Sequence, residues 1–467
     1  MTEDSVPLES IGPALQGVIP SPFATCAADG QPNITYMSIV QYVDSDTVAL
    51  SRQFFNKTRA NLDENPRGQV IVVDPVLGQD YQLDLRYLRT ETEGPIFEAM
   101  RANLEAVSAA QGMEKTFRLR GVDIHRVERC VMASGVERAA GPVRHRERDS
   151  LRRLDEFVRR MSGCTDVEGV TRTALEALDD VFGFQHAILL LADEGSRELF
   201  AVAGHGYEAS TAGAEVRFGA GVVGTAAERQ RVICLSNVAR SRVMRDAVHA
   251  RGSETAALGA TSGHTIALPA LPEAASVAAV PLVVLGRLVG VLYLESDRAG
   301  TFGAEDEQLL RVVGGQLASI LVSIAPEREE QGQPPSTPRR TPATGPRAVV
   351  TYYQADDSVF VGDDYVIKGV PGRILWKMLR EHESYARMLF TNRELRLDES
   401  LGLPPGNDNL EARLLVLRRR LEAGDWPIAL AHVARGRLEL RVTGSIELVE
   451  VQTGGPFRAG EQQIRNS

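Results

Sequence analysis

The segment SRQFFNKTRANLDENPRG, residues 51–68, predicts one short helix between two strands, with an Asn-Pro pair at its end. The helix would begin at Asn56, Lys57 and Thr58, where the first backbone N–H groups have no partner within the helix. A cation, a hydroxyl and free N–H groups at one helix start favour phosphate binding. The alternative is that Asn56 and Thr58 only cap the helix while Lys57 is a solvated cation.

The neighbouring segments predict strands around this helix. Apolar residues run together or alternate with polar ones in 34–43, 47–52, 69–75, 81–94 and 117–127. The pair Gly94-Pro95 opens a second helix. Mostly antiparallel strands with two helices predict a closed or split barrel for residues 1–138.

Residues 24–74 resemble the pyridoxamine 5′-phosphate oxidase-like FMN-binding split barrel, and the similarity covers most of residues 10–135. Its most specific part is the order strand, NKT, helix, NP. The resemblance implies that the helix start holds the flavin phosphate and that the isoalloxazine ring lies along a strand. The candidate FMN-binding residues are Met37, Ser38, Ile39, Ser51, Arg52, Asn56, Lys57 and Thr58.

The chemistry of the barrel stays open at this point. The true oxidases carry an Arg-x-His pattern near the last strand for the substrate phosphate, whereas this chain has DIHRVERC at residues 123–130. The departure argues against turnover of a vitamin substrate, and no catalytic residue is predicted. Barrels of this type either bind FMN or keep the fold without it.

Residues 150–325 predict an α/β domain. Two strands flank the turn ADEGSR, and the glycines of GAGVVG precede a short helix and a strand. A hairpin turning at Leu285-Gly286 and a helix with an apolar stripe at 309–324 follow. The phrases GAGVVGTAAERQRVI and AAVPLVVLGRLVGVLYLES resemble a GAF domain, which implies a sensor for an unknown small-molecule ligand under a variable segment, residues 239–276.

The residues near this pocket do not identify the ligand. Cys234 could anchor a chromophore, but a buried cysteine in a strand is the simpler interpretation. A haem role for His205, His249 or His264 has equally little support. The glycines of GAGVVG predict a turn and not a nucleotide loop, because no lysine follows at P-loop spacing.

Composition limits the classes of function. A length of 467 residues suits roughly three domains, and a net charge of −10 argues against wholesale wrapping of nucleic acid. The four cysteines have no CxxC spacing and the histidines are dispersed, so no metal site or disulfide framework is predicted. No apolar run approaches the ~18 residues of a membrane span, and the start MTEDSVPLES lacks signal-peptide features, so a cytoplasmic location is expected.

The C-terminal part predicts three helices and a hairpin. A capping box at Thr391–Glu394 starts the second helix, and the hairpin turns at Arg435-Gly436-Arg437. Residues 369–442 resemble the DNA-binding output domain of response regulators, which implies a winged helix-turn-helix.

The third helix would read the DNA. Leu410, Leu414, Leu417 and Leu421 form its predicted core face, whereas Ala412, Leu415, Val416 and Arg419 would face outward. Arginines reach phosphates and guanines. The candidate DNA-binding residues are Arg413, Arg418, Arg419, Arg420, Arg435 and Arg437. The alternative is a helix that binds a protein partner or packs on its own sensor.

The sequence thus predicts a multidomain α+β protein with an N-terminal split β-barrel, a central GAF α/β sensor domain and a C-terminal winged helix-turn-helix. The predicted segments are the barrel at 1–138, the GAF domain at 150–325, a flexible linker at 326–347, the winged helix at 348–450 and a tail at 451–467.

The predicted function is a cytoplasmic, signal-sensing transcriptional regulator whose flavin-barrel and GAF inputs control binding to DNA. Apolar stripes at Leu151–Met161 and Leu309–Ile324 suit parallel helix pairing and predict a homodimer. Two alternatives stay open. One is a GAF-regulated, FMN-dependent oxidoreductase of the split-barrel group, and the other is a protein-binding adaptor.

Overall fold

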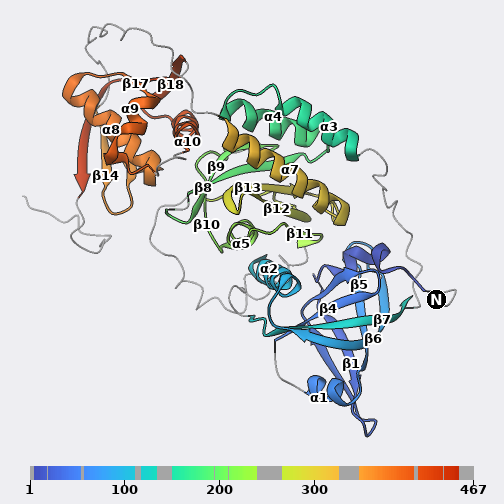
Figure 1. The fold of residues 1–467 in the computed structure, drawn as a ribbon. Coiled ribbons are helices and arrows are strands. Elements are labelled where there is room, and N and C mark those ends of the chain that lie inside the picture. Colours follow the sequence, from blue (N-terminus) through green and yellow to red (C-terminus); the bar gives the residue numbers. More distant parts are fainter. Residues whose placement is uncertain are drawn as a thin grey trace, which may run out of the picture. The chain divides into compact units, whose positions relative to one another are not determined.

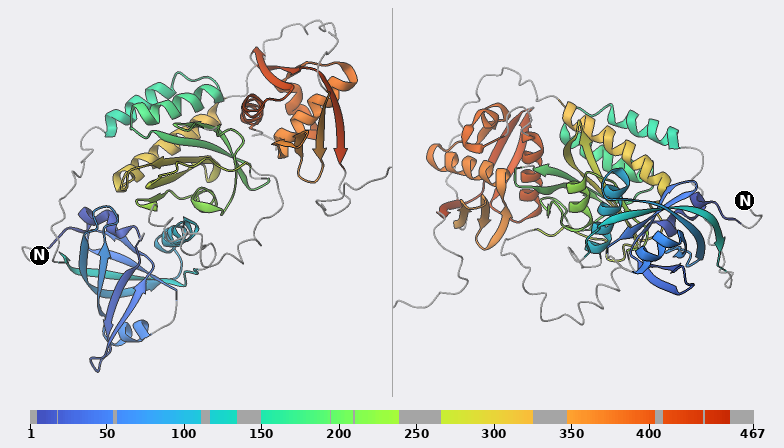
Figure 2. Two further views of the ribbon diagram at one scale, coloured as in Figure 1. Left: turned by 180° about the vertical axis from the view of Figure 1, so that it is seen from behind. Right: turned by 60° about the horizontal axis from the view of Figure 1, so that its bottom comes forward.

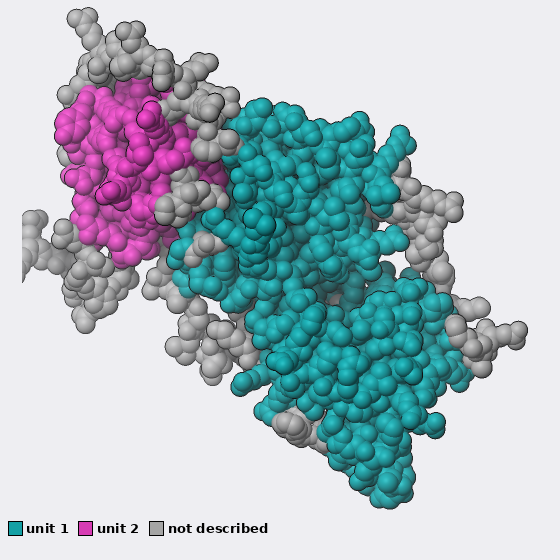
Figure 3. All heavy atoms as spheres, in the orientation of Figure 1, with its two compact units in different colours: residues 1–324 teal, residues 325–467 magenta. Residues whose placement is uncertain are grey.

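The structure is a computed structural model in which the chain forms two compact units, residues 1–324 and 325–467 (Figure 1, Figure 3). The described residues are 5–17, 19–53, 57–110, 117–133, 150–193, 195–208, 210–238, 266–324, 347–403, 409–434 and 436–451. The predicted linker and tail therefore lie almost wholly outside the described residues. Within the described part, no helix has both the length and the hydropathy needed to cross a membrane.

The first part of unit 1 is a seven-stranded sheet in the order β2-β1-β5-β6-β7-β4-β3, with every pair antiparallel. Its strands are β1 (Ser21–Cys26), β2 (Pro32–Met37), β3 (Val40–Asp44), β4 (Thr47–Arg52), β5 (Arg67–Val73), β6 (Asp80–Glu91) and β7 (Gly121–Met132). The helical elements are η1 (Leu8–Leu15), α1 (Lys57–Glu64) and α2 (Pro95–Ala110). A core that includes Phe23, Val70 and Leu83 fills the barrel.

One predicted strand is divided in two. Residues 34–43 form β2 and β3 with a break at Ser38 and Ile39. At the break Ile39 N donates to Ser51 Oγ and Ser51 N donates to Ile39 O, both at 3.0 Å. These bonds redirect the chain and fix the break beside the end of β4.

The second part of unit 1 is a six-stranded sheet in the order β10-β9-β8-β13-β12-β11. Its strands are β8 (His186–Asp193), β9 (Glu198–His205), β10 (Glu215–Arg217), β11 (Ile233–Leu235), β12 (Ser276–Val284) and β13 (Arg287–Ser296). The helices are α3 (Ser150–Met161), α4 (Val167–Asp180), α5 (Gly221–Arg229) and α7 (Ala304–Ser323).

Helices cover both faces of this second sheet. α4 and α7 lie on one face and α5 on the other (Figure 1, Figure 2). The central strands are therefore apolar on both faces, and residues 187–191 of β8 are all buried. The predicted turn at Leu285-Gly286 is confirmed, with φ of 50° and 76° as a type I′ hairpin requires.

The described part of unit 2 combines three α-helices and a short 3-10 helix with two small sheets. Its strands are β14 (Arg347–Tyr353), β15 (Ser358–Val361), β16 (Asp364–Ile367), β17 (Leu389–Thr391), β18 (Ile428–Ala434), β19 (Arg437–Val442) and β20 (Ser445–Val451). Its helical elements are α8 (Gly369–Tyr385), α9 (Asn392–Leu397), η3 (Glu399–Leu401) and α10 (Leu410–Ala423). The sheet orders are β16-β15-β14-β20 and β17-β19-β18. Unit 2 is thus richer in strands than the sequence predicted, because β20 pairs in parallel with β14.

The start of α9 has the predicted capping box. Glu394 N donates to Thr391 Oγ1 at 3.2 Å, and Thr391 N donates to Glu394 Oε1 at 3.0 Å. The two reciprocal bonds satisfy helix-start donors that would otherwise lack partners.

Candidate functional site

The start of α1 lies against the beginning of β2. Lys57 Nζ donates to Gln31 Oε1 at 2.8 Å, and the buried Thr58 accepts from Asn33 Nδ2 at its hydroxyl at 2.9 Å. Asn56 lies outside the described residues. A cation and a hydroxyl therefore stand together at the first turn of α1, as the sequence predicted.

A second group of candidates gathers at the other end of β2. The buried Ser51 accepts from the backbone of the buried Ile39, as described above. Ser38 Oγ accepts from Gln53 Nε2 at 2.7 Å. Met37 is the last residue of β2 and directly precedes Ser38 and Ile39. Gln53, which is 8% exposed, was not predicted as a site residue.

Arg52 points elsewhere. Its side chain lies over Gly121, where an added Cβ would come within 2.6 Å of Arg52 Nη2. Its carbonyl accepts from Arg120 N at 2.8 Å. Arg52 is therefore fixed at the start of β7.

The two groups mark the ends of an open strand edge. Among the described residues β2 pairs in the sheet with β1 alone, and beyond this pairing it contacts β4 and α1. At about 3.3 Å per residue, Gln31 and Met37 stand about 20 Å apart. This edge suits a long, flat ligand with an anionic group at the α1 end.

A polar network that the sequence did not reveal ties α1 to the barrel. Arg59 Nη1 donates to Tyr87 Oη at 2.7 Å and to Thr90 Oγ1 at 2.9 Å. Thr90 Oγ1 in turn donates to Asp123 Oδ1 at 2.5 Å. The Arg59 guanidinium also lies 4.9 Å from the centre of the Tyr87 ring. The network fixes α1, and with it Lys57, relative to β6 and β7.

His125, in the DIHRVERC segment, is fully buried inside the barrel. Its ring lies edge-on to Phe23 and Tyr87, with centroid distances of 5.6 and 5.5 Å. Burial lowers the pKa of His125 to about 4, so the ring is neutral at pH 7 and Nδ1 donates to Asp123 O at 3.0 Å. A neutral, buried imidazole cannot serve as a cation for a substrate phosphate.

In the second part of unit 1, the glycines before and in the first turn of α5 have backbone roles. Gly219 and Gly221 have φ of 80° and 59°. A Cβ on Gly224 would come within 2.1 Å of Arg217 O. The prediction of a turn therefore holds for Gly219, whereas Gly221 and Gly224 belong to the first turn of α5.

The candidate anchors of this part are neutral or already paired. Cys234 lies in β11, and burial raises the pKa of its thiol, which disfavours the thiolate. His205 Nε2 is 3.0 Å from Asp179 Oδ2. His249 and His264 lie outside the described residues. None of these observations supports a haem or chromophore anchor.

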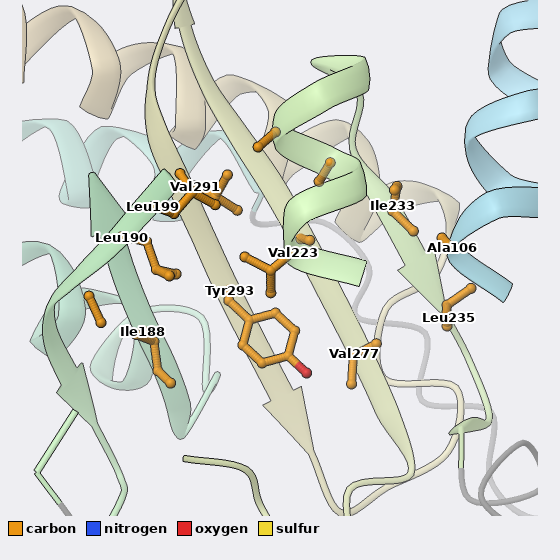
Figure 4. Packing of buried hydrophobic residues seen from close by; sticks show 14 of the residues in the cluster. Ala106, Ile188, Leu190, Leu199, Val223, Ile233, Leu235, Val277, Val291 and Tyr293 are labelled. Atoms are coloured by element: carbon orange, nitrogen blue, oxygen red, sulfur yellow. The ribbon is translucent and has the colours of Figure 1, made fainter. Parts of the chain in front are cut away.

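A buried carboxylate that the sequence did not reveal lies on β13. Glu295 is 2% exposed and accepts from Tyr207 Oη at 2.8 Å and from Tyr293 Oη at 3.0 Å. It also accepts from Leu271 N at 2.8 Å. Figure 4 shows Tyr293 among the apolar side chains of the core. Glu295 thereby fastens the last part of the variable segment, at Leu271, to the sheet.

Helix α2 belongs to two cores. Phe97, Met100 and Leu104 pack in a cluster with Ile39 of the barrel. Ala106 and Val107 join the core of the second sheet, and Figure 4 shows Ala106 beside Ile233 and Leu235. Helix α2 therefore packs against both Ile39 of the barrel and β11 of the second sheet.

In unit 2, α10 differs from the prediction. Leu410, Leu414, Leu417 and Leu421 are buried as expected. Ala412, Leu415 and Val416, which were predicted to face outward, are only 7%, 5% and 3% exposed, so that prediction is wrong. The helix contacts α8, α9, β16 and β18, which is more of its circumference than a helical wheel with one core face assumes.

The candidate arginines of unit 2 fall into different settings. Arg420 donates to Val366 O at 2.9 Å and to Tyr365 O at 3.0 Å, and it lies 5.0 Å from the Trp426 ring. Its role is therefore to hold α10 on β16. Arg418 Nε lies 3.5 Å from Glu422 Oε1.

The other candidate arginines are partly exposed or lie outside the described residues. Arg413 and Arg419 on α10 are half-buried, and Arg437 starts β19. Arg435 lies outside the described residues.

Comparison with known families assigns two parts of the chain. Residues 15–128 match the family model described as pyridoxamine 5′-phosphate oxidase, and residues 164–322 match that of the GAF domain. The chain contains a pyridoxamine 5′-phosphate oxidase-like barrel and a GAF domain. A search of curated proteins gives no match.

Solved structures similar to parts of the chain include an FMN-binding protein from Syntrophomonas wolfei subsp. wolfei, with 19% identity and a TM-score of 0.23 over 28% of this chain and 88% of that one. HupZ of Group A Streptococcus has 26% identity and a TM-score of 0.21 over 26% and 95% of the two chains. Free methionine-R-sulfoxide reductase from Neisseria meningitidis, in complex with its substrate, has 21% identity and a TM-score of 0.28 over 37% and 87%.

Proposed function

We propose that this protein is a signal-sensing transcriptional regulator in which the barrel and the GAF domain control a winged-helix DNA-binding output. The observation that carries the proposal is the element order of unit 2. Three helices precede the β18–β19 hairpin, and β19 also pairs with β17, which lies between α8 and α9. A helix-turn-helix followed by a hairpin wing is an order typical of DNA-binding domains.

The burial of α10 adds a condition to this proposal. Groove reading requires an exposed helix face, yet Ala412, Leu415 and Val416 are buried. DNA binding therefore requires a change that uncovers this face. A change of this kind, driven by a ligand at a sensor domain, would make the output conditional on the signal.

Binding to duplex DNA at low salt tests the output. We expect Arg419→Ala to relax sequence preference by about 1–3 kcal/mol, because a base contact is lost. Arg437→Ala in the wing should weaken all sequences alike and flatten the salt dependence, as the loss of a phosphate contact does. Arg380→Ala, on the exposed side of α8, is the matched control. No binding to any duplex at low salt, with and without candidate ligands, contradicts the proposal.

We also propose that the barrel binds FMN along the free edge of β2. Lys57 and Thr58 would hold the phosphate, and Met37, Ser38 and Ile39 would line the ring. The support is the family match together with a cation and a hydroxyl at one end of an open strand edge. When bound, FMN supplies redox chemistry. The purified protein should show a yellow flavin spectrum, or FMN should restore it after extraction.

A second candidate is a protein-binding adaptor, and the buried apolar face of α10 favours it. Because Ala412, Leu415 and Val416 are buried, α10 does not present the exposed face that groove reading requires, and this favours an output other than DNA. The duplex-binding experiment separates the adaptor from the regulator. NAD(P)H oxidation by the flavin-loaded protein would instead favour the oxidoreductase.

The regulator is proposed to act as a homodimer. Leu151 on α3 and Val312 and Val322 on α7 are 83%, 52% and 42% exposed, which is unusual for large apolar residues on helices that pack together. Pairing with a second copy would bury them. Light scattering at micromolar concentration should give twice the monomer mass, and a monomer there contradicts this part of the proposal.

A further inference from the structure

Unit 1 contains a cavity of about 1150 Å³ between the barrel and the GAF domain. Its walls come from η1, β3 and α2 on the barrel side and from the end of α5, β11, β12 and α7 on the GAF side. The candidate FMN residues do not line it. Ligand sites of several hundred to a thousand cubic ångströms occur preferentially at such domain interfaces.

Direct contacts between the two domains hold the walls of the cavity. Arg229 on α5 donates to both carboxylate oxygens of Glu105 on α2, at 2.7 and 2.5 Å. Asn237 Nδ2 donates to Pro75 O at 2.8 Å, and Ser236 hydrogen-bonds to Gln16. The shared core of α2 adds an apolar contact. The cavity therefore lies between two packed domains.

The walls combine apolar surface with a small positive charge. Apolar residues from both sides include Leu15, Ala99, Val232, Pro281 and Val283. The charged residues are Glu9, Glu307, Arg229, Arg231 and Arg311, an excess of one positive charge.

One of these cations has no partner in the described part of the chain. Arg229 is bound to Glu105, and Arg311 Nη2 donates to Glu307 Oε1 at 2.5 Å. Among the described residues, Arg231 makes no hydrogen bond or ion pair, although it is half-buried. A half-buried guanidinium beside apolar walls is well placed to pair with an anionic group of a bound molecule.

We propose that this cavity binds a small organic monoanion with an apolar body, with the anionic group on Arg231. The apolar walls would gain from burial of the body, and a guanidinium pairs strongly with a carboxylate or sulfonate. A polyanion such as a dinucleotide does not fit, because the walls offer an excess of only one positive charge. A ligand here touches both domains, so its binding also stabilises their packing against each other.

The probe 8-anilinonaphthalene-1-sulfonate, an aromatic monoanion, tests this site in the full chain. Its fluorescence should rise on binding to the folded protein. Arg231→Gln removes the charge and should weaken binding about tenfold, as loss of a charge-assisted contact does. Arg67→Gln, an exposed barrel arginine outside the cavity, should leave binding unchanged.

A second variant fills the cavity. Gly315 on α7 lines it, and a Cβ added at Gly315 would have no atom within 4 Å, so Gly315→Leu projects into open space without a clash. It should abolish probe binding while FMN binding at the barrel persists. Ser319→Leu adds the same side chain one turn further along α7, outside the cavity, and should leave probe binding intact.

Gly12→Leu fills the same cavity from η1 if Gly315→Leu does not fold, because a Cβ there also meets no atom. The proposal is overturned if the folded chain does not bind the probe, or if Arg231→Gln and a folded filling variant both bind it as tightly as the parent chain. Displacement of the probe by FMN would place it in the flavin site and equally overturn the proposal. Failure of FMN binding alone bears on the barrel and leaves this proposal supported by the probe result.

Discussion

At the scale of single residues, two basic side chains lie close together in the barrel in different states. His125 is buried and neutral, whereas Arg59 of α1 is charged and hydrogen-bonded. His125 is enclosed by Phe23 and Tyr87, and Tyr87 also accepts from Arg59. Burial thus keeps one basic side chain neutral, whereas hydrogen bonds keep the other charged and oriented. The two settings have different consequences for stability and for binding.

The free energy of unfolding of unit 1 should fall as the pH falls below the ordinary pKa of histidine, because of His125. Burial lowers the pKa of His125 from 6.5 to about 4. Between these two pH values, His125 is therefore protonated in the unfolded chain but neutral in the folded chain. The stabilisation is complete above pH 6.5 and is lost between pH 6.5 and about 4, by about 3 kcal/mol. Urea unfolding at several pH values measures the loss. His125→Leu should remove this step, and an unchanged pH profile in that variant would contradict the assignment.

Lys57→Ala should weaken FMN binding about tenfold or more, because one charge-assisted contact to the phosphate is lost. Stability of the apo barrel should barely change, since Lys57 is exposed and, among the described residues, donates to Gln31 Oε1 alone. Fluorescence titration with FMN measures the affinity. Arg67→Ala is an exposed control, and equal affinity in parent and Lys57→Ala would show that the α1 start is only a cap.

The sequence could indicate candidate site residues that share one local pattern. Ser51 lies near the end of β4 while Lys57 and Thr58 begin α1, and a cation and a hydroxyl at a helix start are typical of anion binding. The Arg59–Asp123 network and the Glu295 carboxylate could not be predicted, because their partners lie far away in the chain and no local spacing links them.

At the scale of elements, helix α2 packs in two hydrophobic cores, although its sequence predicted only a helix. The pair Gly94-Pro95 predicted the start of this helix, which spans Pro95–Ala110. Its other face carries alanines, which are good helix formers but give no apolar signal for a second core. The packing of Ala106 in the GAF core therefore emerges only in three dimensions.

Ala106→Asp should lower the stability of the barrel and the GAF domain together. Ala106 is fully buried, and an unpaired carboxylate there costs roughly 3–5 kcal/mol. Thermal unfolding followed by circular dichroism should show one lowered transition for unit 1. Ala109→Asp, at a half-buried position of the same helix, is the control. Loss of barrel stability with an unchanged GAF domain would separate the two cores.

The same limit explains the misjudged face of α10. A helical wheel correctly identified the leucines that point to the domain core, such as Leu417 and Leu421. It could not show that Arg420 would bind the backbone of β16, because a carbonyl partner leaves no trace in the pattern of side chains. β20 was missed because a strand with half-exposed residues has a weak alternation.

At the scale of the whole molecule, the division into residues 1–324 and 325–467 differs from the division into three sequence domains. The barrel and the GAF domain share a helix and several polar contacts, whereas unit 2 has its own sheets and helices. Domains that share a core unfold cooperatively, and units with separate cores do so independently.

We therefore expect calorimetry of the full chain to show two transitions and not three. A fragment of residues 1–324 should keep one of them at the same temperature, and a fragment of residues 347–467 should keep the other. FMN at one hundred times its dissociation constant should stabilise unit 1 by about 2.7 kcal/mol and leave the transition of unit 2 in place. Because FMN contacts only the barrel in this proposal, a shift of the GAF signal by the same amount would demonstrate the coupling through α2. A barrel that shifts alone, with the GAF domain unfolding at its former temperature, would contradict a single cooperative unit 1.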